Sequence, residues 1–137
     1  MAIDFPQRSD TVKVLIVDDN EQIREMTKIF LGGIAGEIRE CEDGKDAFDA
    51  YADFLPDWVL MDWEMKQMDG LSATREIIEG FPTARILIFT QFDDSELKAS
   101  ALEAGAIGFV LKDDMQALGS IMQTSTAVGE RYETKYI

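Results

Sequence analysis

The sequence predicts an α/β protein built on one doubly wound, five-stranded parallel sheet. The chain has 137 residues, which suits a single domain, and 46% of them are hydrophobic, enough for an ordinary core. Five short apolar runs alternate with stretches of helical periodicity. Strict alternation of strand and helix is typical of an open parallel sheet with helices on both faces. With right-handed crossovers, the leading strand order is 2-1-3-4-5.

The apolar runs are expected to form the strands. Three of them are nearly continuous, as in strands buried on both faces: Val12–Val17, Trp58–Met61 and Arg85–Phe89. The run Glu37–Cys41 alternates polar and apolar residues, which predicts an edge strand with one wet side. The fifth strand is expected at Ile107–Leu111.

Capping signals place helices between these strands. Asn20 is expected to cap the first helix, and Asp43 to open the second. The apolar face of the first helix is expected to comprise Ile23, Met26, Phe30 and Leu31. The third helix is expected over Leu71–Phe81. Asp93, with Glu96 three residues later, resembles a capping box for the fourth, and the last helix is expected over Met115–Val128.

Composition excludes several classes of function. The 13 basic and 27 acidic residues give a net charge of −14, which opposes binding to nucleic acid or to an anionic membrane. The chain has no histidine, which excludes His-metal sites and Ser-His or Cys-His catalysis. The single cysteine, Cys41, excludes an internal disulfide and fits a reducing compartment. Because the sequence shows neither a secretion signal nor an apolar run of ~20 residues, we expect a cytoplasmic protein.

Polar, reactive side chains follow four of the expected strands. Asp18 and Asp19 follow the first strand, and Asp62 follows the third. Thr90 follows the fourth and Lys112 the fifth. In this sheet order ligands bind in the crevice between the carboxyl ends of the first and third strands, so we expect these side chains to lie together. Clustered carboxylates need a cation or a proton, and an all-oxygen site favours Mg²⁺.

Each of these residues alone is better explained by an ordinary structural role. An Asp-Asp pair after a strand is more often a turn and helix cap than a metal site. Thr90 and Lys112 could be ordinary residues at strand ends, and Asp69-Gly70 is expected to form a loop turn. Their joint placement at one crevice is what indicates a functional site.

Four stretches of the chain resemble the receiver domain of two-component response regulators. They are Val14–Asp19, Val59–Gly70, Phe89–Thr90 and Ala104–Lys112. The likeness covers residues 12–128, which leaves an N-terminal tail at 1–11 and a C-terminal tail or linker at 129–137. The resemblance implies a flavodoxin-like (βα)5 receiver fold and a signalling module rather than an enzyme with a separate substrate.

The resemblance also implies roles for the pocket residues. Asp62 would accept a phosphoryl group, with Mg²⁺, from a histidine of a partner kinase or phosphotransfer protein, or from a small phosphodonor. The implied metal ligands are Asp18, Asp19, Asp62 and the backbone carbonyl of Glu64. Lys112 and Thr90 would contact phosphoryl oxygens.

Thr90 and Phe109 match the family's switch positions. The added charge would draw Thr90 and Lys112 inward and bias the face formed by the fourth helix, fifth strand and fifth helix, which would contact an unidentified output protein. Ordinary core packing explains Phe109 at least as well. Homodimerisation on phosphorylation stays open.

The chain departs from the family pattern at three positions. Lys66 stands where proline is usual, which predicts a less rigid loop. Asp113 also replaces a common proline, which puts in doubt the cis peptide often found after the conserved lysine. Gln91 replaces a small residue, and we expect its bulk to hinder the hydrolytic water and prolong the phosphorylated state.

Two other functions stay open. Residues 129–132 resemble the junction before a helix-turn-helix, so the chain could be the receiver part of a DNA-binding transcription regulator without its output domain. The receiver itself is not expected to bind nucleic acid or membrane. A Mg²⁺-dependent phosphohydrolase with an aspartyl phosphate would need a general acid and a substrate pocket, and the sequence indicates neither.

Overall fold

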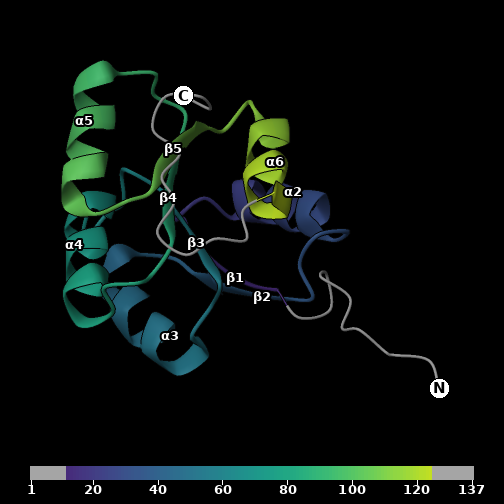
Figure 1. Ribbon diagram of the computed structural model, residues 1–137, viewed down its shortest axis with the longest axis horizontal. Coiled ribbons are helices and arrows are strands. Elements are labelled where there is room, and N and C mark those ends of the chain that lie inside the picture. The colour runs from purple at the N-terminus through teal and green to yellow at the C-terminus, as the bar shows by residue number, and fades with distance from the viewer. Residues whose placement is uncertain (1–11, 125–137) are drawn as a thin grey trace.

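The computed structural model describes residues 12–124 and contains the predicted five-stranded parallel sheet, in the order β2-β1-β3-β4-β5 (Figure 1). The strands are β1 (Lys13–Val17), β2 (Glu37–Cys41), β3 (Trp58–Met61), β4 (Ile86–Thr90) and β5 (Gly108–Leu111). The alternating run Glu37–Cys41 is an edge strand, as predicted. The expected tails at 1–11 and 129–137, and the end of the last helix at 125–128, lie outside the described residues.

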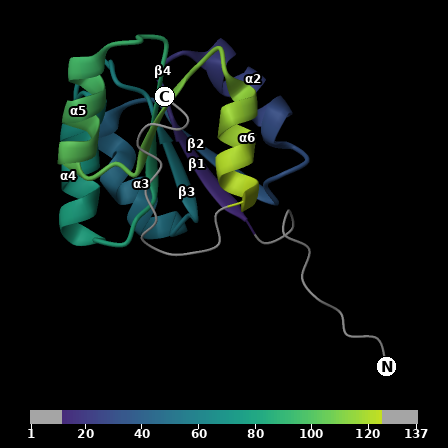
Figure 2. The ribbon, with the colours of Figure 1, turned by 45° about the horizontal axis from the view of Figure 1, so that its top comes forward.

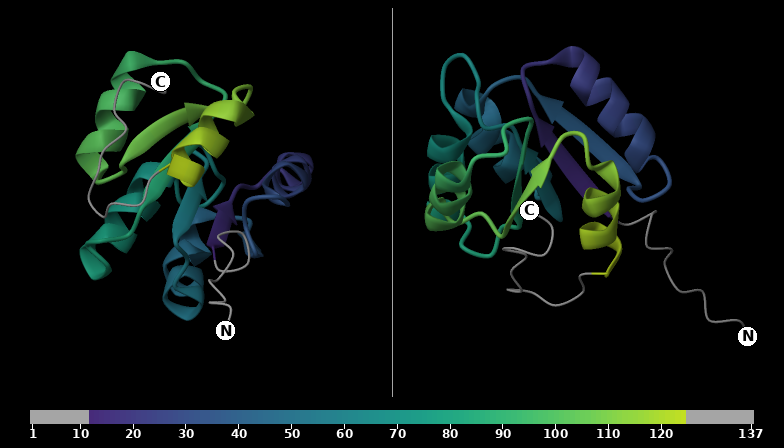
Figure 3. Two further views of the ribbon diagram at one scale, coloured as in Figure 1. Left: turned by 45° about the vertical axis from the view of Figure 1, so that its right-hand side comes forward. Right: turned by 90° about the horizontal axis from the view of Figure 1, so that it is seen from above.

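Helices cover both faces of the sheet. They are α2 (Glu21–Leu31), α3 (Ala47–Phe54), α4 (Gly70–Gly80), α5 (Ser95–Ala104) and α6 (Met115–Thr124), with a 3-10 turn, η1 (Gly44–Asp46), before α3. Figure 2 shows α2 and α6 on one side and α3, α4 and α5 on the other, and the views in Figure 3 agree. No helix within residues 12–124 is long and apolar enough to cross a membrane.

The strands divide their side chains between two cores. In β1, Leu15 and Val17 pack with α3, α4 and α5, whereas Val14 and Ile16 pack with α2 and α6. Successive side chains of a strand point to opposite faces, so a central strand needs apolar residues at every position. This explains the unbroken apolar runs in the sequence.

The start of α2 agrees with the sequence, and three of the four residues expected on its apolar face, Ile23, Phe30 and Leu31, pack in the core. The Asn20 side chain accepts a hydrogen bond from the Ile23 amide at 3.1 Å. The prediction for Met26 was wrong, because its side chain is 56% exposed. Thr27 is buried instead: its hydroxyl donates to the Ile23 carbonyl at 2.7 Å, which satisfies the hydroxyl inside the core.

The predicted cap of the fourth helix was wrong by one residue. Asp94, not Asp93, precedes α5, and its Oδ1 accepts from the amide of Glu96 at 2.8 Å. Asp93 pairs instead with Lys98, with its Oδ1 3.2 Å from the lysine Nζ. Similarly, α4 begins at Gly70, one residue before the predicted start, with Asp69 as its cap.

Candidate functional site

The sheet brings Asp18, Asp19 and Asp62 together. Val17 pairs with Met61 in the β1–β3 ladder, so the residues that follow the two strands leave the sheet side by side. Each of the three aspartates offers a carboxylate oxygen, and these oxygens all lie within 4.8 Å of one another. Asp18 and Asp62 are buried, whereas Asp19 is exposed.

Lys112 reaches the same cluster from the end of β5. Its Nζ lies 2.7 Å from Oδ2 of Asp18 and 3.2 Å from Oδ1 of Asp62. The ammonium therefore bridges the two buried carboxylates. Thr90, at the end of β4, is fully buried, and its hydroxyl oxygen accepts from the Phe92 amide at 3.2 Å.

A pocket of about 330 Å³ opens over these carboxylates. Its lining includes Asp18, Asp19, Asp62, Glu64, Lys66, Gln91 and Lys112. Two of the three departures noted in the sequence, Lys66 and Gln91, therefore border the site. Thr90 and Phe109 are not among the lining residues. Phe109 is fully buried in the core beside α5, as the packing alternative expected.

The pocket raises the pKa of Asp62 from 3.8 to about 6. Burial is the main cause, because it penalises the charged carboxylate, and the negative charge of Asp18 adds to it. Lys112 acts in the opposite direction, through its charge and its hydrogen bond. With this pKa, the Asp62 carboxylate is mostly ionised near pH 7, and a further cation would stabilise its negative charge.

The donor set fits a hard divalent cation. Three carboxylates face a single bridging ammonium, so negative charge is in excess. The three aspartates offer only oxygen atoms as ligands, and oxygen is the ligand atom that Mg²⁺ prefers. Glu64, which follows Asp62 by two residues, is among the residues that line the pocket.

Comparison with known proteins is consistent with this geometry. The family model described as response regulator receiver domain matches residues 14–123. The chain belongs to this family.

The receiver domain has relatives among transcriptional regulators. It is 36% identical over 104 residues to the transcriptional regulatory protein LnrK of Bacillus subtilis, a match that covers 74% of this chain and 47% of LnrK. It is 32% identical to a LuxR-family two-component response regulator from Aurantimonas, with a TM-score of 0.76 and 91% of both chains covered. The receiver domain of a putative NarL from Mycobacterium tuberculosis is 28% identical, with a TM-score of 0.71, over 83% of this chain and 98% of that one. The chain spans about half the length of the first curated relatives it matches.

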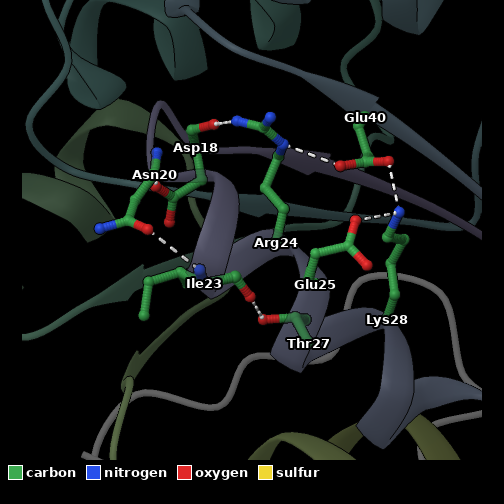
Figure 4. A network of polar contacts seen from close by, with 8 residues as sticks. All are labelled: Asp18, Asn20, Ile23, Arg24, Glu25, Thr27, Lys28 and Glu40. Carbon is green, nitrogen blue, oxygen red and sulfur yellow. Dashed lines mark hydrogen bonds and ion pairs between the residues drawn. The ribbon is translucent and has the colours of Figure 1, made fainter.

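Arg24 contacts the turn that carries Asp18 and Asp19 and stabilises it, a role that the sequence did not reveal (Figure 4). Its buried guanidinium donates from Nη1 to the main-chain carbonyl of Asp18 at 2.7 Å and from Nε to Glu40 at 2.8 Å. Glu40 also contacts Lys28 at 2.7 Å, and hydrogen bonding to Lys28 and Arg24 lowers the pKa of this glutamate against the effect of its partial burial. The network thus ties α2 and β2 to the turn that carries Asp18 and Asp19.

The departure at Asp113, which stands where proline is common in the family, leaves the preceding peptide bond trans. No peptide bond between residues 12 and 124 is cis, including the one between Lys112 and Asp113.

Asp69 and Gly70, expected only as a turn, form the start of α4, where a Cβ on Gly70 would collide with the Asp62 carbonyl oxygen. The helix therefore begins directly behind the backbone of Asp62.

Proposed function

We propose that this receiver domain accepts a phosphoryl group on Asp62, from a histidine of a partner kinase or phosphotransfer protein or from a small phosphodonor. The observation that supports this most is the position of the Asp62 carboxylate, which borders the pocket between two other aspartates and the ammonium of Lys112. No other described cluster combines a nucleophile, a cation and an acidic oxygen set.

The chemistry requires little from the protein beyond position and charge. An ionised oxygen of Asp62 attacks phosphorus, the bond from phosphorus to the donor's nitrogen or oxygen breaks, and the donor leaves with the electron pair. Lys112, which already contacts Asp62, offsets the charge of the incoming phosphoryl oxygens. The Thr90 hydroxyl accepts from the Phe92 amide and keeps its own proton for donation to the phosphoryl group.

We also propose Mg²⁺ as the cofactor, held by Asp18, Asp19, Asp62 and the backbone carbonyl of Glu64. When bound, the ion would neutralise carboxylate and phosphoryl oxygens. The burial and mutual closeness of Asp18 and Asp62 support this, since their charges otherwise repel.

The direct test is labelling with acetyl phosphate and Mg²⁺, followed by intact-mass measurement. Asp62→Asn should abolish the added phosphoryl mass. Asp57→Asn is the matched control, because Asp57 precedes β3 at the opposite end of the strand that Asp62 follows, and this variant should be labelled normally. Undiminished labelling of Asp62→Asn would contradict the proposed site.

For output, we propose that the chain is the receiver part of a longer transcription regulator, which changes its α5–β5–α6 face on phosphorylation, with Thr90 and Phe109 as switch residues. The relatives named as transcriptional regulators, about twice as long as the matched region, support this. Within such a protein we place the receiver at 12–128, flanked by segments 1–11 and 129–137. A cytoplasmic location fits the single buried cysteine. The mass of the native protein tests this part of the proposal.

A further inference from the structure

A third buried aspartate, Asp43, joins two loops outside the acidic cluster. It lies in the turn between β2 and η1 and is 7% exposed. Its Oδ1 accepts from the amides of Lys45 at 2.9 Å and Met68 at 3.0 Å, and its Oδ2 accepts from the amide of Gln67 at 2.8 Å. Gln67 and Met68 belong to the loop between β3 and α4, so one carboxylate connects this loop to the β2–η1 turn.

The two loops also approach each other closely. A Cβ on Gly44 would lie 2.5 Å from the Met68 carbonyl oxygen and 3.2 Å from that of Asp69, so only glycine fits there without a shift. Burial acts to raise the pKa of Asp43, but the backbone amides outweigh it and the pKa is lowered. The residue is therefore a charged acceptor in a tight, ordered contact.

The β3–α4 loop is fixed at both its base and its far side. At the base, the Gly70 amide donates to the Trp63 carbonyl at 2.8 Å. At the far side, Asp43 holds Gln67 and Met68. The segment between these points contains Glu64 and Lys66, which line the pocket. Its conformation therefore depends on Asp43, although no bond from Asp43 reaches the acidic cluster directly.

We propose that Asp43 is a positioning residue that holds the β3–α4 loop so that the backbone carbonyl of Glu64 faces the cation. This inference rests on the proposed function, since it assumes a Mg²⁺ site on Asp18, Asp19 and Asp62. Partners that orient metal ligands typically change metal affinity by about 10–100-fold when they are replaced.

The test compares Asp43→Asn with Asp57→Asn. Asparagine keeps the shape of Asp43, but one of the two carboxylate oxygens is replaced by an NH₂ group. This NH₂ group is a donor that faces a backbone N–H, which is also a donor. Asp57 also accepts from a backbone amide, that of Lys13 at 2.8 Å, but at the opposite end of the sheet. Asp43→Ser, which is shorter and uncharged, is measured in parallel so that the test does not depend on one variant folding.

Mg²⁺ affinity is measured by calorimetry and by tryptophan fluorescence, because Trp63, one of two tryptophans, is adjacent to Asp62 in the sequence. We expect Asp43→Asn to weaken Mg²⁺ binding about tenfold, with near-normal acetyl phosphate labelling once Mg²⁺ is saturating. Asp57→Asn should leave the affinity unchanged. Both should lower the midpoint of urea unfolding.

An unchanged affinity in both Asp43 variants overturns the inference, and so does an equal loss in Asp57→Asn, which would indicate general softening of the fold. A wild-type chain that binds no Mg²⁺ contradicts the proposed function itself and removes the basis of this inference. The two failures are therefore distinguishable.

Discussion

The ammonium group of Lys112 lies closer to Asp18 than to Asp62, at 2.7 Å against 3.2 Å. The Asp18 carboxylate is itself fixed, because its Oδ1 accepts from the Asn20 amide at 2.8 Å. Asp18 therefore orients Lys112 before any phosphoryl group arrives. Such preorganised charge lowers the reorganisation needed during transfer.

Replacement of Lys112 by methionine should raise the pKa of Asp62 above about 6, because the lysine is the cation that opposes burial there. NMR titration of the aspartate carboxyl carbons measures this shift. Labelling by acetyl phosphate should slow by about a hundredfold. Lys45→Met, whose exposed side chain lies in η1, is the control and should change neither quantity. An unaltered Asp62 titration in Lys112→Met would contradict the assigned contact.

Asp62 should destabilise the metal-free fold at neutral and high pH. Its folded pKa is about 6 against an ordinary 3.8, so the folded state favours the protonated form. The stability that this contributes is complete below pH ~4 and is lost as pH rises through about 6. Asp62→Asn should therefore raise the free energy of unfolding at pH 8 by up to about 3 kcal/mol relative to its effect at acid pH. Urea unfolding in EDTA at several pH values measures this, and an effect independent of pH would rule it out.

Mg²⁺ should raise the melting temperature of the wild-type chain. At about a hundred times its dissociation constant, a ligand of the folded state adds about 2.7 kcal/mol. Asp19→Asn should reduce this gain, and because Asp19 is exposed the substitution leaves the core intact. Glu37→Gln, an exposed acid at the far end of the sheet, serves as the control. Equal stabilisation of both variants would argue against Asp19 as a ligand.

Gln91→Ala should shorten the lifetime of the phosphorylated protein several-fold. Gln91 is exposed and lines the pocket, so we expect its side chain to obstruct a hydrolytic water. The half-life of purified phosphorylated protein in excess EDTA tests this. Gln22→Ala, exposed on α2, is the matched control. A decay no faster than that of the wild type would refute this role for Gln91.

Arg24→Met should lower the free energy of unfolding by about 1–3 kcal/mol, because it leaves the buried carbonyl of Asp18 without its donor. Arg39→Met is a matched control. Arg39 pairs with Asp53 at 2.9 Å, but both side chains are exposed, and such pairs contribute little. Equal decreases in the free energy of unfolding of the two variants would show that the buried Arg24 hydrogen bond contributes no more than an exposed ion pair.

The sequence predicted those parts of the fold and site that sheet geometry determines. Parallel strands place their carboxyl ends at one edge, so Asp18 and Asp62 had to be neighbours once the strand order was known, with Lys112 at the same edge. Central strands need apolar residues on both faces, which made β1 and β3 easy to locate.

The sequence did not reveal contacts between side chains and distant backbone groups. Arg24 binds the carbonyl of Asp18, and Asp43 binds the amides of Gln67 and Met68, and backbone partners leave no pattern in residue types. For the same reason, two adjacent aspartates gave no way to choose Asp94 over Asp93 as the cap of α5.

The absence of a side chain at Gly70 has a consequence for the direction of the reaction. Helix α4 begins against the main-chain carbonyl of Asp62, and Asp62 also lines the pocket. An in-line displacement at phosphorus places the nucleophile and the departing group on opposite sides of the phosphorus atom. With Asp62 as the proposed nucleophile, the departing group of either kind of donor would leave on the side of phosphorus away from Asp62, through the pocket.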